Sequence, residues 1–211
     1  MQIEIWSDVI CPWCYIGKRR FEVALAAFPH KEKATVIWRS FELDTKSPSQ
    51  YSETLIEMLS HKYHVSLQEA ENMNAHVSSL AKEVGLEYHL SEARPGNTFD
   101  AHRLLHFAAS RQVGDMAIER LMHAYFAEAL PVGDRAALAS LAPEFGISTQ
   151  DAMAMFESDA FVEAVRADET RASTLGISGV PFFVIDGKIG ISGAQPVDVF
   201  ADALSQSIQS S

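Results

Sequence analysis

The chain has 211 residues, of which 28 are acidic and 17 are basic, so its formal net charge at neutral pH is −11. A surface this acidic repels a phosphate backbone, which excludes nucleic acid as a partner. Hydrophobic residues make up 47% of the chain, and no run reaches the ~18 apolar residues of a membrane span. We therefore expect a soluble globular protein with a large core and no membrane contact.

The N-terminal part predicts a β-α-β unit. Residues 3–7 alternate between apolar and polar side chains as a strand does, and residues 35–41 are rich in β-branched and aromatic side chains. Between them, Pro12 suits the first turn of a helix, where its missing N–H leaves no hydrogen bond unmade. The chain starts as strand, without the basic and apolar segments of a secretory leader, so we expect a cytoplasmic location.

The middle of the chain, residues 51–175, predicts helices and no strand. Side chains that can cap a helix N-terminus precede apolar positions at helical spacing. The predicted helix starts are Ser66 with Glu69 as a capping box, Asn97, Asp134, Ser148 and Ser158. The predicted helix ends are Gly85, Gly114, Gly146 and Gly176.

The C-terminal part returns to strands. Residues 180–185 form an apolar run, Asp186-Gly187 is a hairpin signal, and residues 188–192 provide the partner strand before a final helix that opens near Pro196. The order β-α-β, helical block, β-β-α predicts an α/β thioredoxin-like fold with a large all-helical insertion. The expected domains are residues 1–50 with 176–211 and, inserted between them, residues 51–175.

The chemistry centres on the only two cysteines, in Cys11-Pro12-Trp13-Cys14. Two thiols in a C-x-x-C pattern on the first turn of a helix can close a disulfide, and the helix N-terminus favours the thiolate, which is the nucleophile of disulfide exchange. Two other interpretations of the cysteine pair are a structural zinc site and inert core cysteines. A structural zinc site needs four ligands and finds only these two, and the Pro-Trp insert at a strand-to-helix junction argues against inert core cysteines.

Three segments resemble the FrnE-like branch of the DsbA family of thiol-disulfide oxidoreductases, and more distantly the kappa-class glutathione transferases and 2-hydroxychromene-2-carboxylate isomerases. They are residues 11–18 (CPWCYIGK), residues 97–104 (NTFDAHRL), and residues 176–183 (GISGVPFF) followed by residues 191–195 (ISGAQ). The resemblance spans nearly the whole chain. A C-x-x-C motif together with a distant Val-Pro at the start of a strand is far more specific than either pattern alone.

The resemblance assigns roles to individual residues. Cys11 would form the mixed disulfide with the substrate and Cys14, less accessible, would resolve it. Pro12 and Trp13 would tune the pair and contact substrate. Pro181 would be the cis-proline of the family, and the backbone of Val180 would pair with an extended substrate segment.

These roles need no bound cofactor beyond the redox-active Cys11–Cys14 disulfide and no metal. Glutathione is a candidate co-substrate, because the backbone amides near Gln195 at the start of the last helix could hold one of its carboxylates. The expected partners are protein or small-molecule disulfides and thiols.

Other charged or ionisable residues near the motif have uncertain roles. Thioredoxin-like enzymes commonly carry a buried carboxylate six residues before the first cysteine, where this chain has Ile5. Glu4 should face away from that side of the strand and Asp8 lies in a turn, so the proton acceptor for Cys14 stays unassigned. Two further features have a plain structural interpretation: the run Lys18-Arg19-Arg20 as a solvated helix face, and His102 as a packed core histidine.

Three functions remain open from the sequence. The first is a thiol-disulfide oxidoreductase. The second is a glutathione-dependent isomerase or transferase on the same fold, whose members typically have serine at the position of Cys11. The third is a peptide-binding, chaperone-like module that uses the groove beside Pro181, in which case binding would survive the loss of both thiols.

Overall fold

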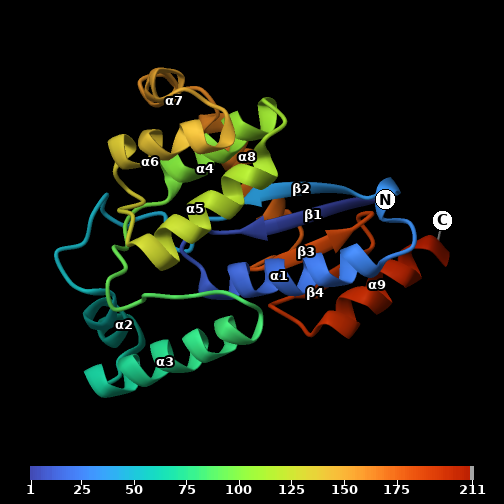
Figure 1. The fold of residues 1–211 in the computed structure, drawn as a ribbon, viewed down its shortest axis with the longest axis horizontal. Coiled ribbons are helices and arrows are strands. Elements are labelled where there is room, and N and C mark those ends of the chain that lie inside the picture. The colour runs from blue at the N-terminus through green and yellow to red at the C-terminus, as the bar shows by residue number, and fades with distance from the viewer. Residues whose placement is uncertain (210–211) are drawn as a thin grey trace. The chain divides into compact units, whose positions relative to one another are not determined.

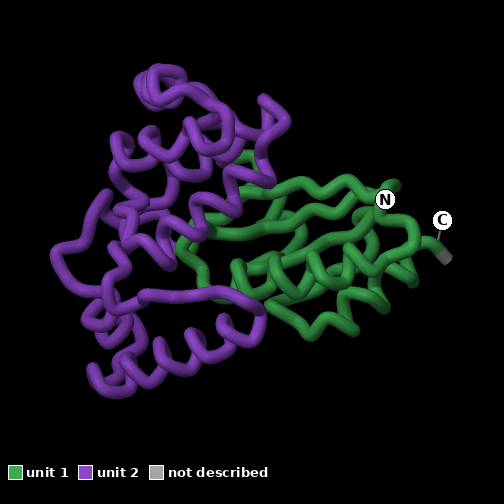
Figure 2. Tube along the Cα trace, in the orientation of Figure 1, with its two compact units in different colours: residues 1–43, 166–211 green, residues 44–165 purple. Residues whose placement is uncertain are grey.

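The computed structural model describes residues 1–209 and divides into two compact units. One combines Met1–Leu43 with the segment that begins at Arg166, and the other is Asp44–Val165 (Figure 2). The predicted domain boundaries lie after residues 50 and 175, so the boundaries of the structure differ from them. The second boundary lies earlier in the chain than predicted, because Asp168 and Arg171 bond to the strands of the first unit. The sequence assigns the helix that carries these two residues to the insertion.

The elements of the first unit are β1 (Gln2–Ser7), α1 (Pro12–Ala27), a 3-10 turn (Lys31–Lys33), β2 (Thr35–Ser40), most of α8 (Val162–Thr174), β3 (Phe182–Ile185), β4 (Ile189–Ser192) and α9 (Val197–Gln209). The second unit contains α2 (Leu55–Tyr63), α3 (Leu67–Glu83), α4 (Phe99–Ser110), α5 (Gly114–Glu128), α6 (Arg135–Leu141), a 3-10 turn (Ala142–Phe145) and α7 (Thr149–Phe156).

The sheet has the strand order β2-β1-β3-β4 (Figure 1). β1 pairs in parallel with β2, which requires the crossover helix α1, and antiparallel with β3, which pairs antiparallel with β4. Ile5 is thus opposite Trp38 on one side and Phe183 on the other. The predicted thioredoxin-like order is confirmed, and it places the carboxyl end of the central strand β1 directly before the cysteine motif.

Strand alternation gives the sheet two different faces. Ile3 and Ile5 point into a core with Phe21 of α1 and Phe200 of α9, where the aromatic rings of Phe21 and Phe200 meet edge to face at 5.9 Å. Trp6 points the other way, into a smaller apolar cluster that includes Ala172 of α8. Burying both faces is what makes the central strand rigid enough to hold the motif that follows it.

Glu4 shares the Trp6 face and is the centre of a buried ion-pair network. Its carboxylate accepts hydrogen bonds from Arg39 Nη2 at 2.7 Å and from Arg171 Nη2 at 2.6 Å, and Arg39 also bonds to Asp168 at 2.9 Å. Burial acts to raise the pKa of Glu4, but the bonds from Arg171 and Arg39 outweigh it and hold that pKa below the usual value. As alternation predicts, Glu4 is turned away from Ile5, and it joins β1, β2 and α8.

The depressed pKa of Glu4 gives its stabilising effect a definite pH range. We expect Glu4→Gln to lower the free energy of unfolding by about 2 kcal/mol at neutral pH, because it removes the charge from a buried acceptor of hydrogen bonds from two arginines. The difference from wild type should persist above the unfolded pKa of about 4.3 and vanish as the pH falls through the lower folded pKa. Urea unfolding between pH 3 and 8 measures this. Glu169→Gln, in a more exposed pair with Arg166, is the control, and an equal loss from both variants would contradict the assignment.

The regular elements of the second unit within its described residues are helices and no strand, as predicted for residues 51–175. The capping box of Ser66 and Glu69 and the caps at Asp134 and Ser148 are confirmed. Asn97 accepts from the N–H of Phe99 at 2.9 Å, but the N-cap residue of α4 is Thr98, so this predicted start lies one residue early. Two further predictions are wrong. Ser158 starts no helix, since its hydroxyl accepts from Ala160 and α8 begins at Val162. Gly114 is the first residue of α5 rather than the end of α4, because the chain reverses earlier, at Gln112 with φ of 64°.

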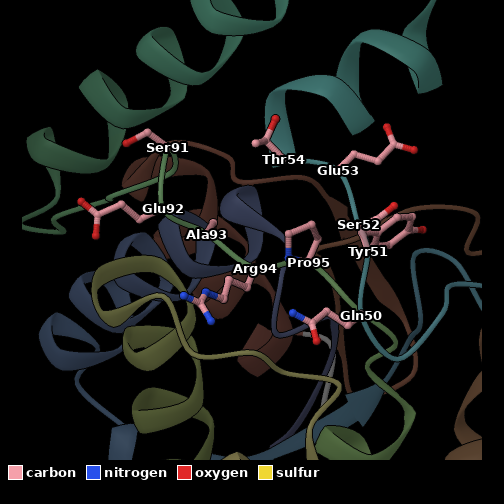
Figure 3. A pocket seen from close by; sticks show the side chains of 10 residues that line it. All are labelled: Gln50, Tyr51, Ser52, Glu53, Thr54, Ser91, Glu92, Ala93, Arg94 and Pro95. Atoms are coloured by element: carbon pink, nitrogen blue, oxygen red, sulfur yellow. The ribbon is translucent and has the colours of Figure 1, made fainter.

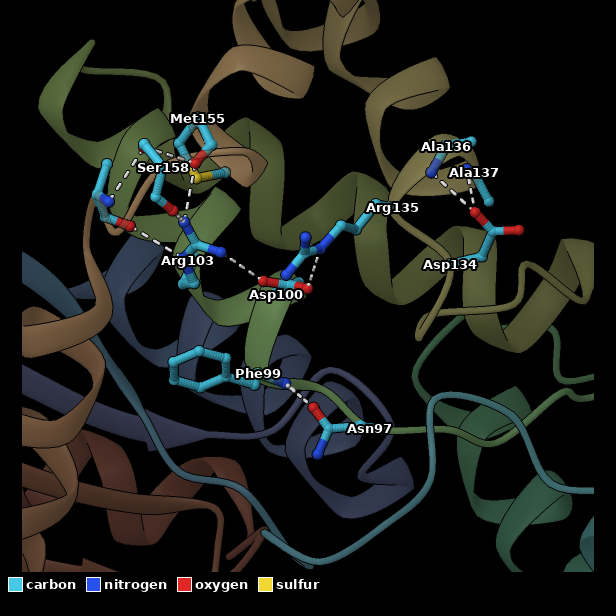
Figure 4. A network of polar contacts seen from close by, with 11 residues as sticks. Asn97, Phe99, Asp100, Arg103, Asp134, Arg135, Ala136, Ala137, Met155 and Ser158 are labelled. Atoms are coloured by element: carbon cyan, nitrogen blue, oxygen red, sulfur yellow. Dashed lines mark hydrogen bonds and ion pairs between the residues drawn. The ribbon is translucent and has the colours of Figure 1, made fainter.

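Arg103 of α4 is 2% exposed and organises this unit (Figure 4). Its guanidinium donates to the carbonyl oxygens of Met155 at 2.8 Å and Ala160 at 2.9 Å, to that of Ser158, and to Asp100 at 2.7 Å. The carbonyls belong to the end of α7 and the turn that follows, where a helix leaves its last acceptors without partners. One buried cation thus caps α7 and joins it to α4.

Within residues 1–209, none of the helices has the length and apolar character needed to cross a membrane.

Candidate active site

The cysteine motif begins where β1 ends. Cys11 is the N-cap residue of α1, with φ of −83° and ψ of 112°, and its N–H donates to the carbonyl of Asp8 at 3.1 Å across a tight turn. Pro12 occupies the first helical turn, as predicted. The carbonyl of Cys11 accepts from the N–H of Cys14 at 3.0 Å. Both sulfurs therefore lie at the N-terminal end of α1, where the helix dipole favours a negative charge.

Cys14 is the more deeply buried of the two free thiols, 1% exposed against 3% for Cys11. Burial raises the pKa of the Cys14 thiol well above its usual range, and the hydrogen bond and charge of Cys11 raise it further. The backbone N–H of Asp8 and the hydroxyl of Ser7 act in the opposite direction. The Cys14 thiol therefore keeps its proton at neutral pH, which suits a thiol that acts second.

The sequence interpretation missed Ser7. Its hydroxyl oxygen is buried and bonds to no oxygen or nitrogen atom of residues 1–209, so the neighbouring Cys14 thiol is its polar contact. Asp8, seen in the sequence only as a turn residue, is fully buried and accepts from the N–H of Leu43 at 2.8 Å. Two polar residues at the end of an apolar strand, directly before the motif, were the available signal.

The Val180–Pro181 segment lies beside the motif, directly before the strand β3 that pairs with β1. The peptide bond between these two residues is cis, as expected for Pro181. The Cys11 thiol donates to the carbonyl oxygen of Val180 with a sulfur–oxygen distance of 3.6 Å. Pro181 is buried and precedes β3, which pairs with β1. The sheet therefore brings together Cys11, Cys14, Val180 and Pro181, all of which the sequence singled out.

This combination of a buried thiol pair at a helix N-terminus and a facing cis-proline agrees with a comparison against protein families. Residues 2–205 match the model of the DSBA-like thioredoxin domain. The chain belongs to this family. A protein of known structure, the probable DsbA oxidoreductase SCO1869 from Streptomyces coelicolor, is 41% identical to it with a TM-score of 0.95, over 99% of this chain and 90% of the other.

Two other similar proteins are more distant. The uncharacterized protein YwbO of Bacillus subtilis is 28% identical over 97% of this chain and 96% of its own length. The cytosolic disulfide reductase DsbM from Pseudomonas aeruginosa is 16% identical, with a TM-score of 0.68 over 100% of both chains, and has also been solved with glutathione. At that identity DsbM shows a common fold and no more.

Trp13 is the most exposed residue of this DsbA-like motif. The indole is 40% exposed, whereas both thiols are almost fully covered. Pro12 is partly exposed beside it. No hydrogen bond within residues 1–209 uses the backbone N–H of Val180, so this amide keeps a donor for another molecule. Pro12, Trp13 and Val180 thus offer contact area and one hydrogen-bond donor near Cys11.

The run Lys18-Arg19-Arg20 is not the solvated helix face that the sequence predicted. Lys18 is only 3% exposed and bonds to Glu22 at 2.5 Å. Arg19 also bonds to Glu22 and lies over the ring of Tyr15 at 5.1 Å. Arg20 donates to the carbonyl of Ala194 at 2.6 Å. The prediction failed because these side chains bond to Glu22 of the same helix and to Ala194, far along the chain, instead of to solvent. A helical pattern alone does not reveal the contact with Ala194.

Other ionisable residues of the DsbA-like chain lie in the second unit. His102, on α4, is buried, and its backbone N–H bonds to Thr98. A pocket of about 240 Å³ lies between two loops, residues 50–54 and residues 91–95, and Arg94 is its one basic lining residue (Figure 3). Among residues 1–209 no three His, Cys, Asp or Glu side chains lie close enough to hold a metal ion.

Proposed function

We propose that the chain is a thiol-disulfide oxidoreductase in which Cys11 attacks and Cys14 resolves. The observation that carries the proposal is the placement of Cys11 at the N-terminus of α1, 3.6 Å from the carbonyl of Val180 and beside the cis peptide of Pro181. An extended substrate segment that hydrogen-bonds to the backbone of Val180 would present its disulfide to Cys11 as an added strand. Trp13 would cover the apolar side of such a segment.

The reaction is a pair of exchanges. The Cys11 thiolate attacks one sulfur of a substrate disulfide, the substrate S–S bond breaks, and the released substrate thiolate takes up a proton. Cys14 then loses its proton to solvent and attacks Cys11, which frees the second substrate sulfur as a thiolate and closes the Cys11–Cys14 disulfide. The substrate gains two electrons and the enzyme loses two. Two molecules of a monothiol such as glutathione restore the dithiol and become a disulfide.

We place this reaction in a reducing compartment, where the net direction is substrate reduction or isomerisation. Reduction potentials of such pairs range from roughly −270 to −120 mV, and the cytosolic glutathione poise is about −220 to −320 mV. If the potential of the pair lies about 100 mV above that poise, the dithiol exceeds the disulfide by about three orders of magnitude at equilibrium. DsbM, which shares the fold, is a cytosolic disulfide reductase solved with glutathione, in keeping with this direction.

The test is catalysed reduction of insulin disulfides by glutathione, with the potential of the pair measured by glutathione titration. Wild type should accelerate reduction and Cys11→Ser should fall to the uncatalysed rate, because the alkoxide that serine would need is inaccessible at neutral pH. Equal melting temperatures exclude unfolding as the cause. Full activity in Cys11→Ser would refute the assignment.

The two other functions give different outcomes in the same experiment. The transferase or isomerase would be favoured if wild type shows no disulfide exchange but conjugates or isomerises a substrate in a reaction that requires glutathione. Peptide binding that is unchanged when both Cys11 and Cys14 are serine would favour the chaperone-like module.

A further inference from the structure

The loop between β4 and α9 connects the cis-proline segment to the redox helix. The N–H of Gly193 donates to the carbonyl of Pro181 at 2.8 Å, and the carbonyl of the next residue, Ala194, accepts from Arg20 Nη1 of α1 at 2.6 Å. Among residues 1–209, Arg20 has no carboxylate partner, so its charge is used on this carbonyl. A bond from a charged donor is stronger than an ordinary amide bond, which makes this a firm attachment of the loop to α1.

Gly17 provides the space for the same attachment. A glycine inside a helix normally lowers stability, so its presence needs a reason. A Cβ atom at Gly17 would lie 3.0 Å from Pro181 Cγ and 3.4 Å from Ala194 Cα. The ring of Pro181 and the loop therefore rest directly on the backbone of α1, one helical turn beyond Cys14.

We propose that Arg20 and Gly17 are positioning residues that set the placement of the Val180–Pro181 segment relative to Cys11. Arg20 fixes the loop, the loop fixes the carbonyl of Pro181 through Gly193, and Gly17 lets the Pro181 ring approach closely. The preceding residue, Val180, then keeps its carbonyl 3.6 Å from Cys11 Sγ. This inference rests on the proposed function, since the segment so placed is the one that would bind an extended disulfide substrate.

Three variants test the attachment itself. Arg20→Ala removes the bond to Ala194, Arg20→Lys keeps a single charged donor, and Lys31→Ala is the matched control, because Lys31 bonds to the carbonyl of Ala26 at 3.1 Å at the far end of α1. Hydrogen exchange of the Gly193 amide, read by NMR, should be about tenfold faster in Arg20→Ala. It should be intermediate in Arg20→Lys and unchanged in Lys31→Ala.

The functional readout is the ratio of kcat/KM for a disulfide-bonded peptide to that for dithiobis(nitrobenzoate), a small disulfide with no peptide backbone to pair with Val180. We expect this ratio to fall roughly tenfold in Arg20→Ala, because small displacements of a positioning segment have large kinetic effects. Gly17→Ala should give a similar fall with the arginine intact. A merely structural role would lower the melting temperature and leave the ratio unchanged.

The outcomes separate the two proposals. If wild type reduces neither disulfide, the proposed function fails, and exchange of the Gly193 amide alone decides whether Arg20 holds the loop. If wild type is active and Arg20→Ala has wild-type Gly193 exchange or a wild-type substrate ratio, the positioning inference is overturned. A wild-type ratio in Gly17→Ala overturns it as well.

Discussion

Replacement of Cys14 by serine is expected to trap the chain as a mixed disulfide with its substrate. Cys11 would still attack, but no internal thiol would remain to release the adduct. Only external thiol could then resolve it, and the loss of a neighbouring nucleophile should slow turnover about a thousandfold. Mass spectrometry after mixing with a disulfide-bonded peptide should detect a stable adduct on Cys14→Ser and none on Cys11→Ser. Wild-type turnover by Cys14→Ser would contradict the resolving role.

The environment of Cys14 adds a pH dependence to this result. Its raised pKa in the free dithiol comes from burial and from the hydrogen bond and charge of Cys11. When Cys11 enters a mixed disulfide, its charge and hydrogen bond are lost, while the Asp8 N–H and the Ser7 hydroxyl remain. Cys14 thus becomes more acidic at the step that needs its thiolate. The wild-type adduct should decay faster as the pH rises, because resolution requires deprotonation.

Replacement of Arg103 by methionine is expected to cause the largest loss of stability. The change leaves the carbonyls of Met155, Ser158 and Ala160 without their buried donor. Breaking a buried charged network of this kind costs about 3–5 kcal/mol of unfolding free energy, which lowers the melting temperature by roughly 10 °C. Calorimetry and urea unfolding measure the change.

Arg135→Met is the matched control for this prediction. Arg135 bonds to the same Asp100 carboxylate at 2.6 Å, but its side chain is 51% exposed. Its removal should cost less than about 1 kcal/mol. Equal losses from the two variants would show that the carbonyl contacts of Arg103 contribute nothing.

The sequence predicted the parts of this molecule that depend on local pattern. Alternation identified β1, β-branched and aromatic content identified β2, and an apolar run with a hairpin turn signal identified β3 and β4. The C-x-x-C spacing with Pro12 identified the helix N-terminus that carries the thiols. Capping side chains at Ser66, Asp134 and Ser148 correctly marked helix starts. These signals are readable because each follows from the geometry of a few neighbouring residues.

Features that depend on distant parts of the chain were not predictable in the same way. Lys18, Arg19 and Arg20 look like an exposed basic run, and only the folded chain shows Arg20 bonded to Ala194, 174 positions away. Ser7 gains its relation to Cys14 from a turn whose geometry the sequence does not specify. The second boundary between the units lies earlier in the chain than predicted, because Asp168 and Arg171 pair with residues of β1 and β2. For Arg20, Asp168 and Arg171 a long-range contact overrides a local pattern, and for Ser7 the geometry of the turn decides.

The position of β3 has a consequence for how the protein is made. β1 lies between β2 and β3, and β3 starts only at Phe182. A ribosome adding about 5–20 residues per second needs roughly 10–30 s after Cys14 before β3 and the carbonyl of Val180 become available. During that interval the nascent chain displays two thiols without the strand and carbonyl that later cover them. Synthesis therefore exposes both sulfurs to any oxidant or electrophile near the ribosome until Val180 and β3 have been made.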